Sequence, residues 1–204
     1  MRDWPPLVAP RFRNAVFLDR DGTINIDTHY PYKVEDLEFL PGALQALVAL
    51  ADLPAHIIVV SNQAGIALGM YTRDAMSAFN HRLRHIVENA GGRIDAFYYC
   101  PHREQKDLAP GERPCPCSKP APGMLLEASA DFRLDLSHSV LAGDKASDVA
   151  AGTAAGCYTI LVAPTNRGSE PAADFVVPDL PAMLPILNSL LEQRVAMRRS
   201  VRTA

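Results

Sequence analysis

Short apolar runs alternate with segments of helical periodicity along the first half of the chain. Residues 15–19 (AVFLD) and 56–62 (HIIVVSN) are apolar runs that end in polar residues, a pattern typical of buried strands. Between them, apolar residues recur at helical spacing over 40–52, after Pro41, which is favourable in the first turn of a helix. The pattern predicts a strand, a helix and a second strand.

The alternation continues to the end of the chain. A helix is predicted over 72–92, with Thr72 as its N-cap and Gly91 at its end. The remaining predicted strands are 95–100, 139–144, 157–163 and 174–178, and the remaining predicted helices are 122–132, 146–156 and 180–193. Strands that alternate with helices of about a dozen residues favour parallel pairing through right-handed crossovers. We therefore predict an α/β fold with a doubly wound parallel sheet.

Residues 101–122 break this alternation. The segment, PHREQKDLAPGERPCPCSKPAP, is rich in proline and charge and has neither helical nor strand periodicity. A structureless loop of this length is uncommon inside a compact domain, so it needs a source of order other than an apolar core.

Length and composition limit the classes of protein that remain. At 204 residues, 48% of them apolar, the chain is of ordinary size for one domain (1–204) with a real core. Its net charge of −3 argues against binding nucleic acid by bulk phosphate attraction. No stretch resembles a signal peptide or a membrane span, so we expect a cytoplasmic protein with no membrane partner. In that reducing compartment its four cysteines favour thiols or metal ligands over disulfides.

Polar residues that suit chemistry follow several of the predicted strands. Asp19 and Asp21 follow the first strand, Ser61 lies at the end of the second, and Asp144 follows the fourth. Ligands of a doubly wound sheet bind at the carboxyl ends of its strands, so these groups are expected to converge with Lys119, which precedes a helix. Taken singly, each aspartate is more simply explained as a turn or cap residue. Their repetition at successive strand ends favours a site where Mg²⁺ and a phosphate offset the crowded carboxylates.

Four ordered motifs carry a resemblance that covers nearly the whole chain. DRDGT (19–23), SNQ (61–63), SKPAPGM (118–124) and GDKASD (143–148) resemble the four motifs of haloacid dehalogenase (HAD) superfamily phosphatases. The resemblance implies a HAD-like Rossmannoid fold with a minimal cap. It also implies Mg²⁺-dependent hydrolysis of a phosphomonoester through an aspartyl phosphate.

The same resemblance gives roles to individual residues. Asp19 is the expected nucleophile, and Asp21 the expected general acid and then general base, since alternate residues of an extended segment point the same way. Ser61 is expected to donate a hydrogen bond to one phosphoryl oxygen and Lys119 to hold another.

The resemblance also implies the ligands of the magnesium ion. These are Asp19, the carbonyl of Asp21, and Asp144. Lys145 is expected beside this cluster, where it offsets negative charge and contacts substrate, and Asp148 is expected in the outer shell of the metal.

The aperiodic loop carries a second candidate metal site, formed by three cysteines and a histidine. Three thiols and one imidazole are enough for a closed tetrahedral zinc site. These residues are Cys100, His102, Cys115 and Cys117. Disulfide pairing would leave His102 unexplained, whereas metal binding would supply the free energy that orders loop 100–117. With four protein ligands the zinc is expected to be structural. Cys157, at the start of a predicted strand, is interpreted as a core residue.

The cysteine loop narrows the resemblance. CxH…CxC followed by Lys-Pro resembles the D-glycero-D-manno-heptose 1,7-bisphosphate phosphatases and the related histidinol-phosphate phosphatases. YYCPH (98–102) and KPAPGMLL (119–126) look closest to the heptose enzymes. The implied substrate is a small phosphorylated sugar. His29 is one of the residues expected to contact it, but a histidine at this position is equally typical of an exposed surface residue. The residues that this resemblance puts beside the substrate are Asp27, Thr28, His29, Tyr30, Asn62, Gln63, Ala64 and Ser118.

Three basic residues that the family usually carries are replaced in this chain. Ser118 stands where an arginine usually precedes the motif lysine, and residues 67–70 (ALGM) replace an ARGK-like run. A second phosphate adds about two charges, and each charge-assisted contact is worth about 1.5–3 kcal/mol. A less charged phosphomonoester, bound through apolar contacts at Leu68 and Met70, is therefore an alternative substrate. Candidate replacement cations are Arg20, Arg73 and Arg103.

Two alternative functions stay open. One is a histidinol-phosphate or other small-metabolite phosphatase of the same family. The other is a catalytically inactive scaffold whose zinc loop binds a partner; the presence of both motif aspartates and the modest charge of the loop argue against it. A nucleic-acid phosphatase is disfavoured because the chain lacks an evident stacking platform. The tail 194–204, with four arginines, is interpreted as a solvated helix end.

Overall fold

A six-stranded, all-parallel sheet forms the centre of the molecule. The computed structural model describes residues 11–104, 107–163 and 172–191, so the first ten residues and the tail 194–204 lie outside the described part. The strand order is β3-β2-β1-β4-β5-β6. The strands are β1 (Ala15–Leu18), β2 (His56–Asn62), β3 (Ala96–Cys100), β4 (Val140–Gly143), β5 (Tyr158–Val162) and β6 (Phe175–Val177). The predicted parallel α/β fold is confirmed.

Helices separate the first five of these strands along the chain. The α-helices are α1 (Ala43–Leu50), α2 (Arg73–Asn89), α3 (Gly123–Phe132) and α4 (Ala146–Ala155), and residues 184–191 are also helical. Short 3₁₀ turns are η1 (Val34–Asp36), η3 (Leu136–His138) and η4 (Pro181–Met183). As expected, Thr72 caps α2, since its side chain accepts a hydrogen bond from the amide of Ala75 at 3.2 Å.

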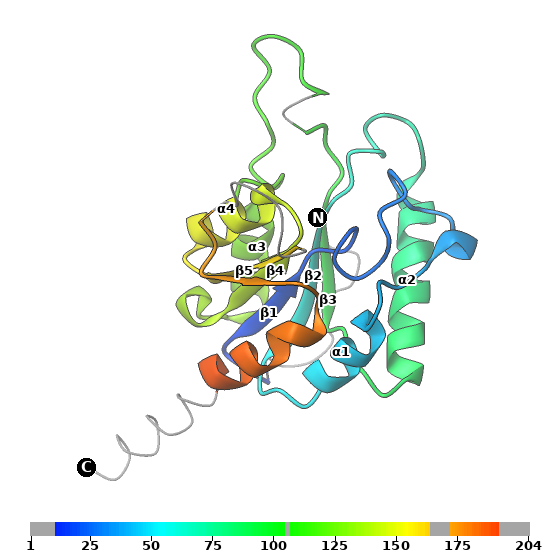
Figure 1. Ribbon diagram of the computed structural model, residues 1–204. Helices are drawn as coiled ribbons and strands as arrows, with labels where there is room; N and C mark the ends of the chain where they lie inside the picture. The colour runs from blue at the N-terminus through cyan, green and yellow to red at the C-terminus, as the bar shows by residue number, and fades with distance from the viewer. Residues whose placement is uncertain (1–10, 105–106, 164–171, 192–204) are drawn as a thin grey trace.

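Helices cover both faces of the sheet, as a doubly wound fold requires. In β1, Val16 and Leu18 point to the face covered by α1, α2 and the helix at 184–191, whereas Ala15 and Phe17 point to the face covered by α3. Figure 1 shows α3 and α4 on one side of the strands and α1 and α2 on the other. All four β1 side chains are fully buried, because the strand has a helical layer on each side.

Two predicted helices begin later than the sequence pattern indicates. Pro41 was expected in the first turn of a helix, but α1 begins at Ala43, after a turn. The N-cap Gly42 has φ +75°, a left-handed conformation that cannot continue a helix backwards. The last helix is likewise preceded by the 3₁₀ turn η4, with Pro181 at its first position.

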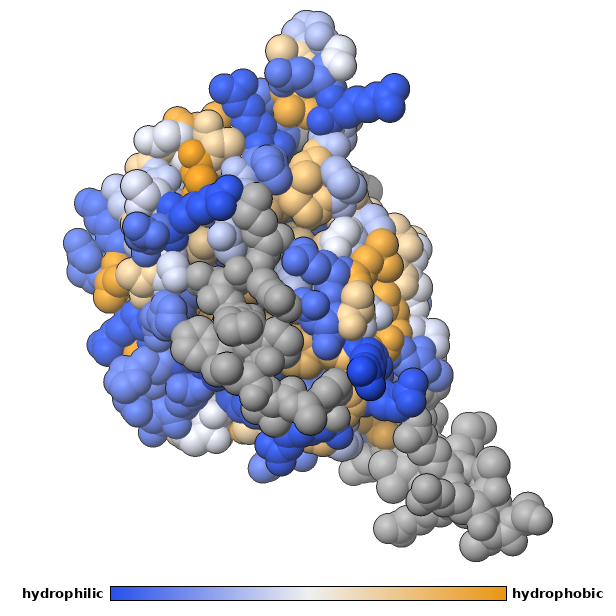
Figure 2. Space-filling view, turned by 180° about the vertical axis from the view of Figure 1, so that it is seen from behind, coloured by the Kyte–Doolittle hydropathy of each residue, from blue (hydrophilic) through white to orange (hydrophobic). Residues whose placement is uncertain are grey.

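A long loop projects beyond the sheet at one end of the molecule (Figure 1). In its described part, residues 101–104 and 107–122, it contains neither a strand nor an α-helix. Figure 2 shows that hydrophilic residues dominate this projecting part, with a few apolar residues among them. Between β1 and α1 the chain adds only isolated bridges and η1, which agrees with a minimal cap. Among the described residues, no helix has the length and apolarity that crossing a membrane requires.

Candidate active site

The carboxyl ends of three neighbouring strands meet at one edge of the sheet. β1 lies between β2 and β4, and its last residue, Leu18, pairs with Val59 on one side and Ala142 on the other. Asp19 follows directly, and its amide still donates to the carbonyl of Ala142 at 2.9 Å. This register carries Asp19 to the end of β4, where Asp144 follows the last strand residue.

A buried lysine lies among the acidic side chains at this edge. Lys119 Nζ donates to Asp19 Oδ1 at 2.7 Å and to the carbonyl of Val60 at 3.0 Å, and forms an ion pair with Asp148 Oδ1 at 2.5 Å. Asp19, Lys119 and Asp148 are all at most 5% exposed. Carboxylate oxygens of Asp19, Asp144 and Asp148 lie within 4.8 Å of one another. Asp148, expected in an outer shell, therefore lies beside the other two acids.

Burial and crowding shift the protonation equilibria of this cluster. Burial, reinforced by the charges of Asp148 and Asp144 and only partly offset by Lys119, raises the pKa of Asp19 to about 7. Burial and the charge of Asp148 also raise the pKa of Asp144 above its ordinary value, against the effect of Lys145. For Lys119, burial favours the neutral amine, but Asp148 and Asp19 outweigh it and raise its pKa. The cluster thus has an excess of negative charge that a cation would relieve.

The oxygen atoms of this cluster fit a hard divalent cation. Asp144 Oδ1 is buried and accepts no hydrogen bond from the described residues. The backbone of Gly22, with φ +90°, approaches so closely that a Cβ there would lie 2.5 Å from Asp144 Oδ2. Carboxylate oxygens are the ligands that Mg²⁺ prefers, and an unpaired buried oxygen is costly without a partner. The site therefore suits the metal that its residue types predict.

Asp21 is held by a buried arginine next to it in the sequence. Arg20 Nε and Nη2 donate to the two oxygens of Asp21, each at 2.8 Å, and Nη1 donates to Asn80 Oδ1 at 2.9 Å. The Asp21 carboxylate also accepts from Asn25 Nδ2 and Gln63 Nε2, both at 3.0 Å. Arg20 is 1% exposed, so it is not available to meet a second phosphate, a role considered for it above. Its charge instead fixes the orientation of Asp21.

The SNQ motif supplies a hydroxyl group to the site and hydrogen bonds to the segment that carries Lys119. Ser61 Oγ accepts a hydrogen bond from Gln63 Nε2 at 2.8 Å, so its own proton can be donated toward the cavity. Asn62 forms two hydrogen bonds with the backbone of Lys119, both at 3.0 Å. Asn62 Nδ2 donates to the Lys119 carbonyl, and Asn62 Oδ1 accepts from the Lys119 amide. Asn62 thereby ties the end of β2 to the lysine-bearing segment.

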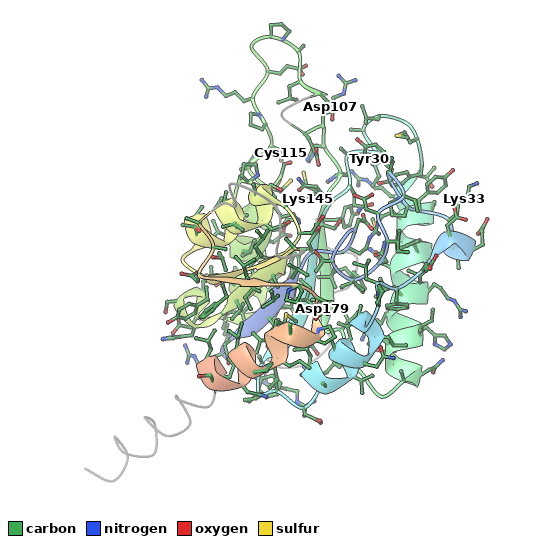
Figure 3. All side chains as sticks on the ribbon, viewed as in Figure 1. Tyr30, Lys33, Asp107, Cys115, Lys145 and Asp179 are labelled. Atoms are coloured by element: carbon green, nitrogen blue, oxygen red, sulfur yellow. The ribbon has the colours of Figure 1, made fainter. Side chains whose placement is uncertain are left out.

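A cavity of about 370 Å³ opens over these groups. Figure 3 shows Tyr30 and Lys145 at this end of the molecule, with Cys115 near the base of the projecting loop. His29 and Tyr30 adopt left-handed backbone conformations, with φ of 60° and 64°, which are uncommon for residues with side chains. The cavity is lined by Asp19, Asp21, Asp27, His29, Tyr30, Ser61, Asn62, Glu104, Lys119, Pro120, Lys145 and Ser147.

Several candidate substrate residues lie elsewhere. Gln63 and Ala64 are each 1% exposed and do not line the described cavity, because Gln63 turns inward to bind Asp21 and Ser61. Ser118 is buried, and Thr28 is exposed but also outside the cavity lining. Leu68 and Met70 are 39% and 50% exposed and likewise do not line it. The predicted apolar contact with substrate therefore has no counterpart in the cavity wall.

The cysteine loop forms a second cluster near the first. Cys117 Sγ lies 3.0 Å from Cys100 Sγ and 2.9 Å from Cys115 Sγ, and His102 Nδ1 lies 3.5 Å from Cys117 Sγ. All four cysteines of the chain are free thiols. The hydrogen bond from Cys117 lowers the pKa of Cys100 to about 5, and the same contact raises that of Cys117. The four side chains together could hold a metal ion.

Comparison with known proteins gives the same result as the motifs. A family model described as HAD-hydrolase-like matches residues 116–183. The chain is 36% identical over 170 residues to the D-glycero-beta-D-manno-heptose-1,7-bisphosphate 7-phosphatase of Photorhabdus laumondii, covering 81% of this chain and 90% of that protein. It is 34% identical over 194 residues to the enzyme of the same name from Escherichia coli K12, covering 93% and 96%. The chain belongs to this family of HAD-like phosphatases.

Solved structures agree with the assignment to the heptose bisphosphate phosphatase family. A HAD-like phosphatase from Mesorhizobium loti has a TM-score of 0.76 and 33% identity, covering 90% of each chain. The D,D-heptose 1,7-bisphosphate phosphatase of B. bronchiseptica, solved with magnesium and phosphate, has a TM-score of 0.73 and 28% identity, covering 88% of this chain and 99% of that one. The chain is therefore a phosphatase, that is, a phosphoric monoester hydrolase.

Three residues that support or line the site of this family member have little or no signal in the sequence pattern. Asn80, which orients Arg20, is a polar residue among the buried positions of α2, between Phe79 and Leu83, and that irregularity is its sequence signal. Tyr71 donates to Gln63 Oε1 at 2.8 Å. Glu104 lines the cavity from a loop without periodicity, so nothing in the sequence pattern marks it.

Proposed function

We propose that this family member is a Mg²⁺-dependent phosphomonoesterase that removes the 7-phosphate of D-glycero-D-manno-heptose 1,7-bisphosphate. The observation that supports the chemistry is the buried group of Asp19, Asp144, Asp148 and Lys119 at the base of the cavity. The relatives named above act on that bisphosphate by their names, which supports the substrate.

Asp19 is the proposed nucleophile. Its carboxylate attacks phosphorus in line, the bond to the sugar oxygen breaks, and an aspartyl phosphate forms. Lys119 and Ser61 are the proposed donors to the phosphoryl oxygens. Lys119 is fixed by Asp19, Asp148 and the carbonyl of Val60, so it needs little reorganisation when negative charge develops.

Asp21 is the proposed general acid for the leaving sugar oxygen and then the base for the hydrolytic water. Both of its oxygens accept hydrogen bonds from Arg20, so at least one of these bonds must be released for the carboxyl group to carry the proton that it gives to the leaving oxygen and later recovers from the attacking water. Binding of substrate in the cavity that Asp21 lines supplies a competing partner.

Two metals complete the proposal. Asp19, Asp144 and the Asp21 carbonyl would hold Mg²⁺, and Mg²⁺ neutralises charge on the carboxylates and the phosphate when bound. Asp148 already accepts from the amide of Lys145 at 3.0 Å and pairs with Lys119, which favours a role beside the metal ligands. The cysteine loop would hold a structural Zn²⁺ through its three thiols and His102.

The proposed function also includes a domain organisation, a compartment and a partner. The single continuous sheet supports one phosphatase domain over residues 1–204 with loop 100–117 inserted in it. Thiol ligands that must stay reduced support a cytoplasmic enzyme. The proposed partner is the phosphorylated sugar, with Asp27, His29, Tyr30, Asn62 and Lys145 contacting it from the cavity wall.

The test is phosphate release from the heptose 1,7-bisphosphate, from sugar monophosphates and from histidinol phosphate, each with excess Mg²⁺ and with a chelator. We expect turnover only with Mg²⁺, and the highest kcat/KM for the bisphosphate, cleaved at the 7-position. A higher kcat/KM for histidinol phosphate would transfer the assignment to that alternative. No turnover of any ester would favour the inactive scaffold.

A further inference from the structure

Gln63 lies behind two of the proposed catalytic side chains and contacts both through one amide group. Its Nε2 atom donates to Ser61 Oγ at 2.8 Å and to Asp21 Oδ2 at 3.0 Å. Its Oε1 atom accepts from Tyr71 Oη at 2.8 Å and from Arg20 Nη2 at 3.2 Å. Gln63 is 1% exposed and does not line the described cavity, so it can affect the reaction only through its neighbours.

The chemistry of these partners fixes the orientation of the Gln63 amide. A guanidinium group can only donate hydrogen bonds, so the amide oxygen must face Arg20. An ionised carboxylate can only accept them, so the amide nitrogen must face Asp21. Ser61 Oγ then accepts from that nitrogen, and its own proton is left for an acceptor on the cavity side, where a phosphoryl oxygen is proposed to bind.

Tyr71 comes from the loop that follows β2, outside the four sequence motifs, and packing holds its hydroxyl in place. Its ring stacks on that of Tyr32, with 4.9 Å between the centroids and an interplanar angle of 15°. It also packs in a buried cluster with Met76 and Tyr99. Burial raises the pKa of the Tyr71 phenol, so the hydroxyl stays protonated and donates to Gln63.

We propose that Gln63 is a positioning residue that sets the proton of Ser61 and the carboxylate of Asp21 together. Tyr71 and Arg20 hold the Gln63 amide in the orientation that this requires. This inference rests on the proposed phosphatase function and assigns a further residue to the same site. The Ser61 proton points to the phosphate position before substrate binds, and Asp21 stays tied to the amide when a bond from Arg20 is released. Donors that are oriented in advance contribute most to catalysis.

Gln63→Glu tests the inference, because a carboxylate of the same shape has two acceptors and no donor. The Ser61 proton would turn toward the substituted side chain and away from the phosphate, and Asp21 would face a second acceptor. The measurement is kcat/KM at saturating Mg²⁺, for the ester that the wild-type protein cleaves best, in the wild-type background and in Ser61→Ala. We expect Gln63→Glu to lower kcat/KM about 100-fold in the wild-type background but only about tenfold in Ser61→Ala, where the contribution of Ser61 is already lost.

Tyr71→Phe is a milder variant that keeps the ring and its stacking. It removes one of the two donors that hold the Gln63 oxygen, so kcat/KM should fall about fivefold in the wild-type background and about twofold in Ser61→Ala. The matched controls are Gln45→Glu and Tyr158→Phe, since both side chains are exposed and lie outside the cavity lining. Each should keep kcat/KM within about twofold of the wild-type value, like other surface substitutions.

The comparison of the two backgrounds separates positioning from support of the fold. A loss in Ser61→Ala that equals or exceeds the loss in the wild-type background means that Gln63 does not act through Ser61. That result, or no loss in either background, overturns the inference while leaving the phosphatase assignment intact. If circular dichroism shows that Gln63→Glu does not fold, the same two measurements with Tyr71→Phe decide. A wild-type protein that cleaves no ester overturns both.

Discussion

The two ends of the sheet carry aspartates, Asp19 buried and Asp95 partly buried, whose protonation equilibria are shifted in opposite directions. At the carboxyl end of β1, burial and the neighbouring charges of Asp148 and Asp144 raise the pKa of Asp19 to about 7. At the amino end, burial also acts to raise the pKa of Asp95, just before β3, but hydrogen bonds from His56 and the amide of Ile57, with the charge of Arg93, hold it below its ordinary value. An aspartate carboxylate is therefore destabilised as an anion at the carboxyl end of the sheet and stabilised as an anion at the amino end.

The difference lies in the partners that each end supplies. Asp95 Oδ2 accepts from Ile57 N at 2.8 Å, His56 Nδ1 at 3.2 Å and Arg93 Nη1 at 2.5 Å. His56 in turn accepts from the amide of Phe12 at Nε2, so its proton is assigned to Nδ1, facing Asp95. The amino end thus satisfies its charge internally. The carboxyl end holds like charges together, an arrangement that costs stability and prepares the site for a cation and a phosphate.

The largest expected effect separates the two aspartates by activity. Asp19→Asn should lower kcat by at least about 10³-fold, because the amide cannot attack phosphorus or serve as an anionic metal ligand. Phosphate release from small esters with Mg²⁺ measures it, and circular dichroism checks the fold. Asp95→Asn, the same change at the other end of the sheet, should keep kcat within a few fold. Retained turnover in Asp19→Asn would remove this residue as the nucleophile.

The second prediction concerns metal as a source of order at the carboxyl end. Protein purified without added metal should contain about one zinc per chain, and Cys115→Ser should lose it. Without the ion, loop 100–117 lacks an apolar core, so amide hydrogen exchange should rise there and in the adjoining segment that carries Lys119. Exchange near Asp95, where hydrogen bonds supply the order, should be unchanged.

The matched control for this variant is Cys157→Ser. Cys157 is a 7% exposed thiol outside the cluster, packed among apolar side chains next to β5. Its substitution should leave the zinc content at the wild-type value even if it lowers stability. Metal-free protein with a protected loop would contradict the zinc assignment.

The third prediction concerns the amino end of the sheet, where substitution of Asp95 is expected to change stability. Asp95→Asn should lower the free energy of unfolding by about 2 kcal/mol at pH 7, because a neutral amide oxygen replaces the charged Oδ2 that accepts from Ile57 N, His56 and Arg93. Urea denaturation measures the change. Asp52→Asn, at an exposed position, should shift it by less than about 0.5 kcal/mol. An equal loss in both variants would mean that the hydrogen bonds of Asp95 add nothing beyond a surface charge.

The sequence predicts the functional end of the sheet better than its supporting residues. Strand ends are marked by a change from apolar to polar residues, so the order of the elements and the meeting of Asp19, Asp144 and Lys119 follow from pattern and topology. The direction of the Arg20 side chain does not follow from the sequence. The motif DRDGT is compatible with an arginine that faces a phosphate and with one that faces Asp21. Gln63 likewise turns inward through local backbone geometry that spacing does not encode.

Contacts between distant segments are the least predictable part. Asn80 reaches Arg20 only because α2 packs with that face toward the site, and helix rotation depends on the whole core. Glu104 meets Asn62 across 42 positions of the chain, from a loop with no period to indicate its direction. The sequence pattern places the start of α1 too early. Pro41 is typical of the first turn of a helix, but the left-handed conformation of Gly42, with φ +75°, determines where the helix begins.

The smallest expected effect is the pH dependence of the contribution of Asp95. Its folded pKa lies below the unfolded value of 3.8, so the folded state favours the ionised carboxylate. That stability is fully present above the unfolded pKa and is lost as pH falls through the folded pKa. The difference in unfolding free energy between the wild type and Asp95→Asn should therefore be constant from pH 7 to about 5 and should shrink as the pH falls toward 2.5. Denaturation curves for both proteins over that range measure it. A difference that grows with acidity would mean that the pKa of Asp95 is raised, as that of Asp19 is, and the contrast between the two ends of the sheet would be lost.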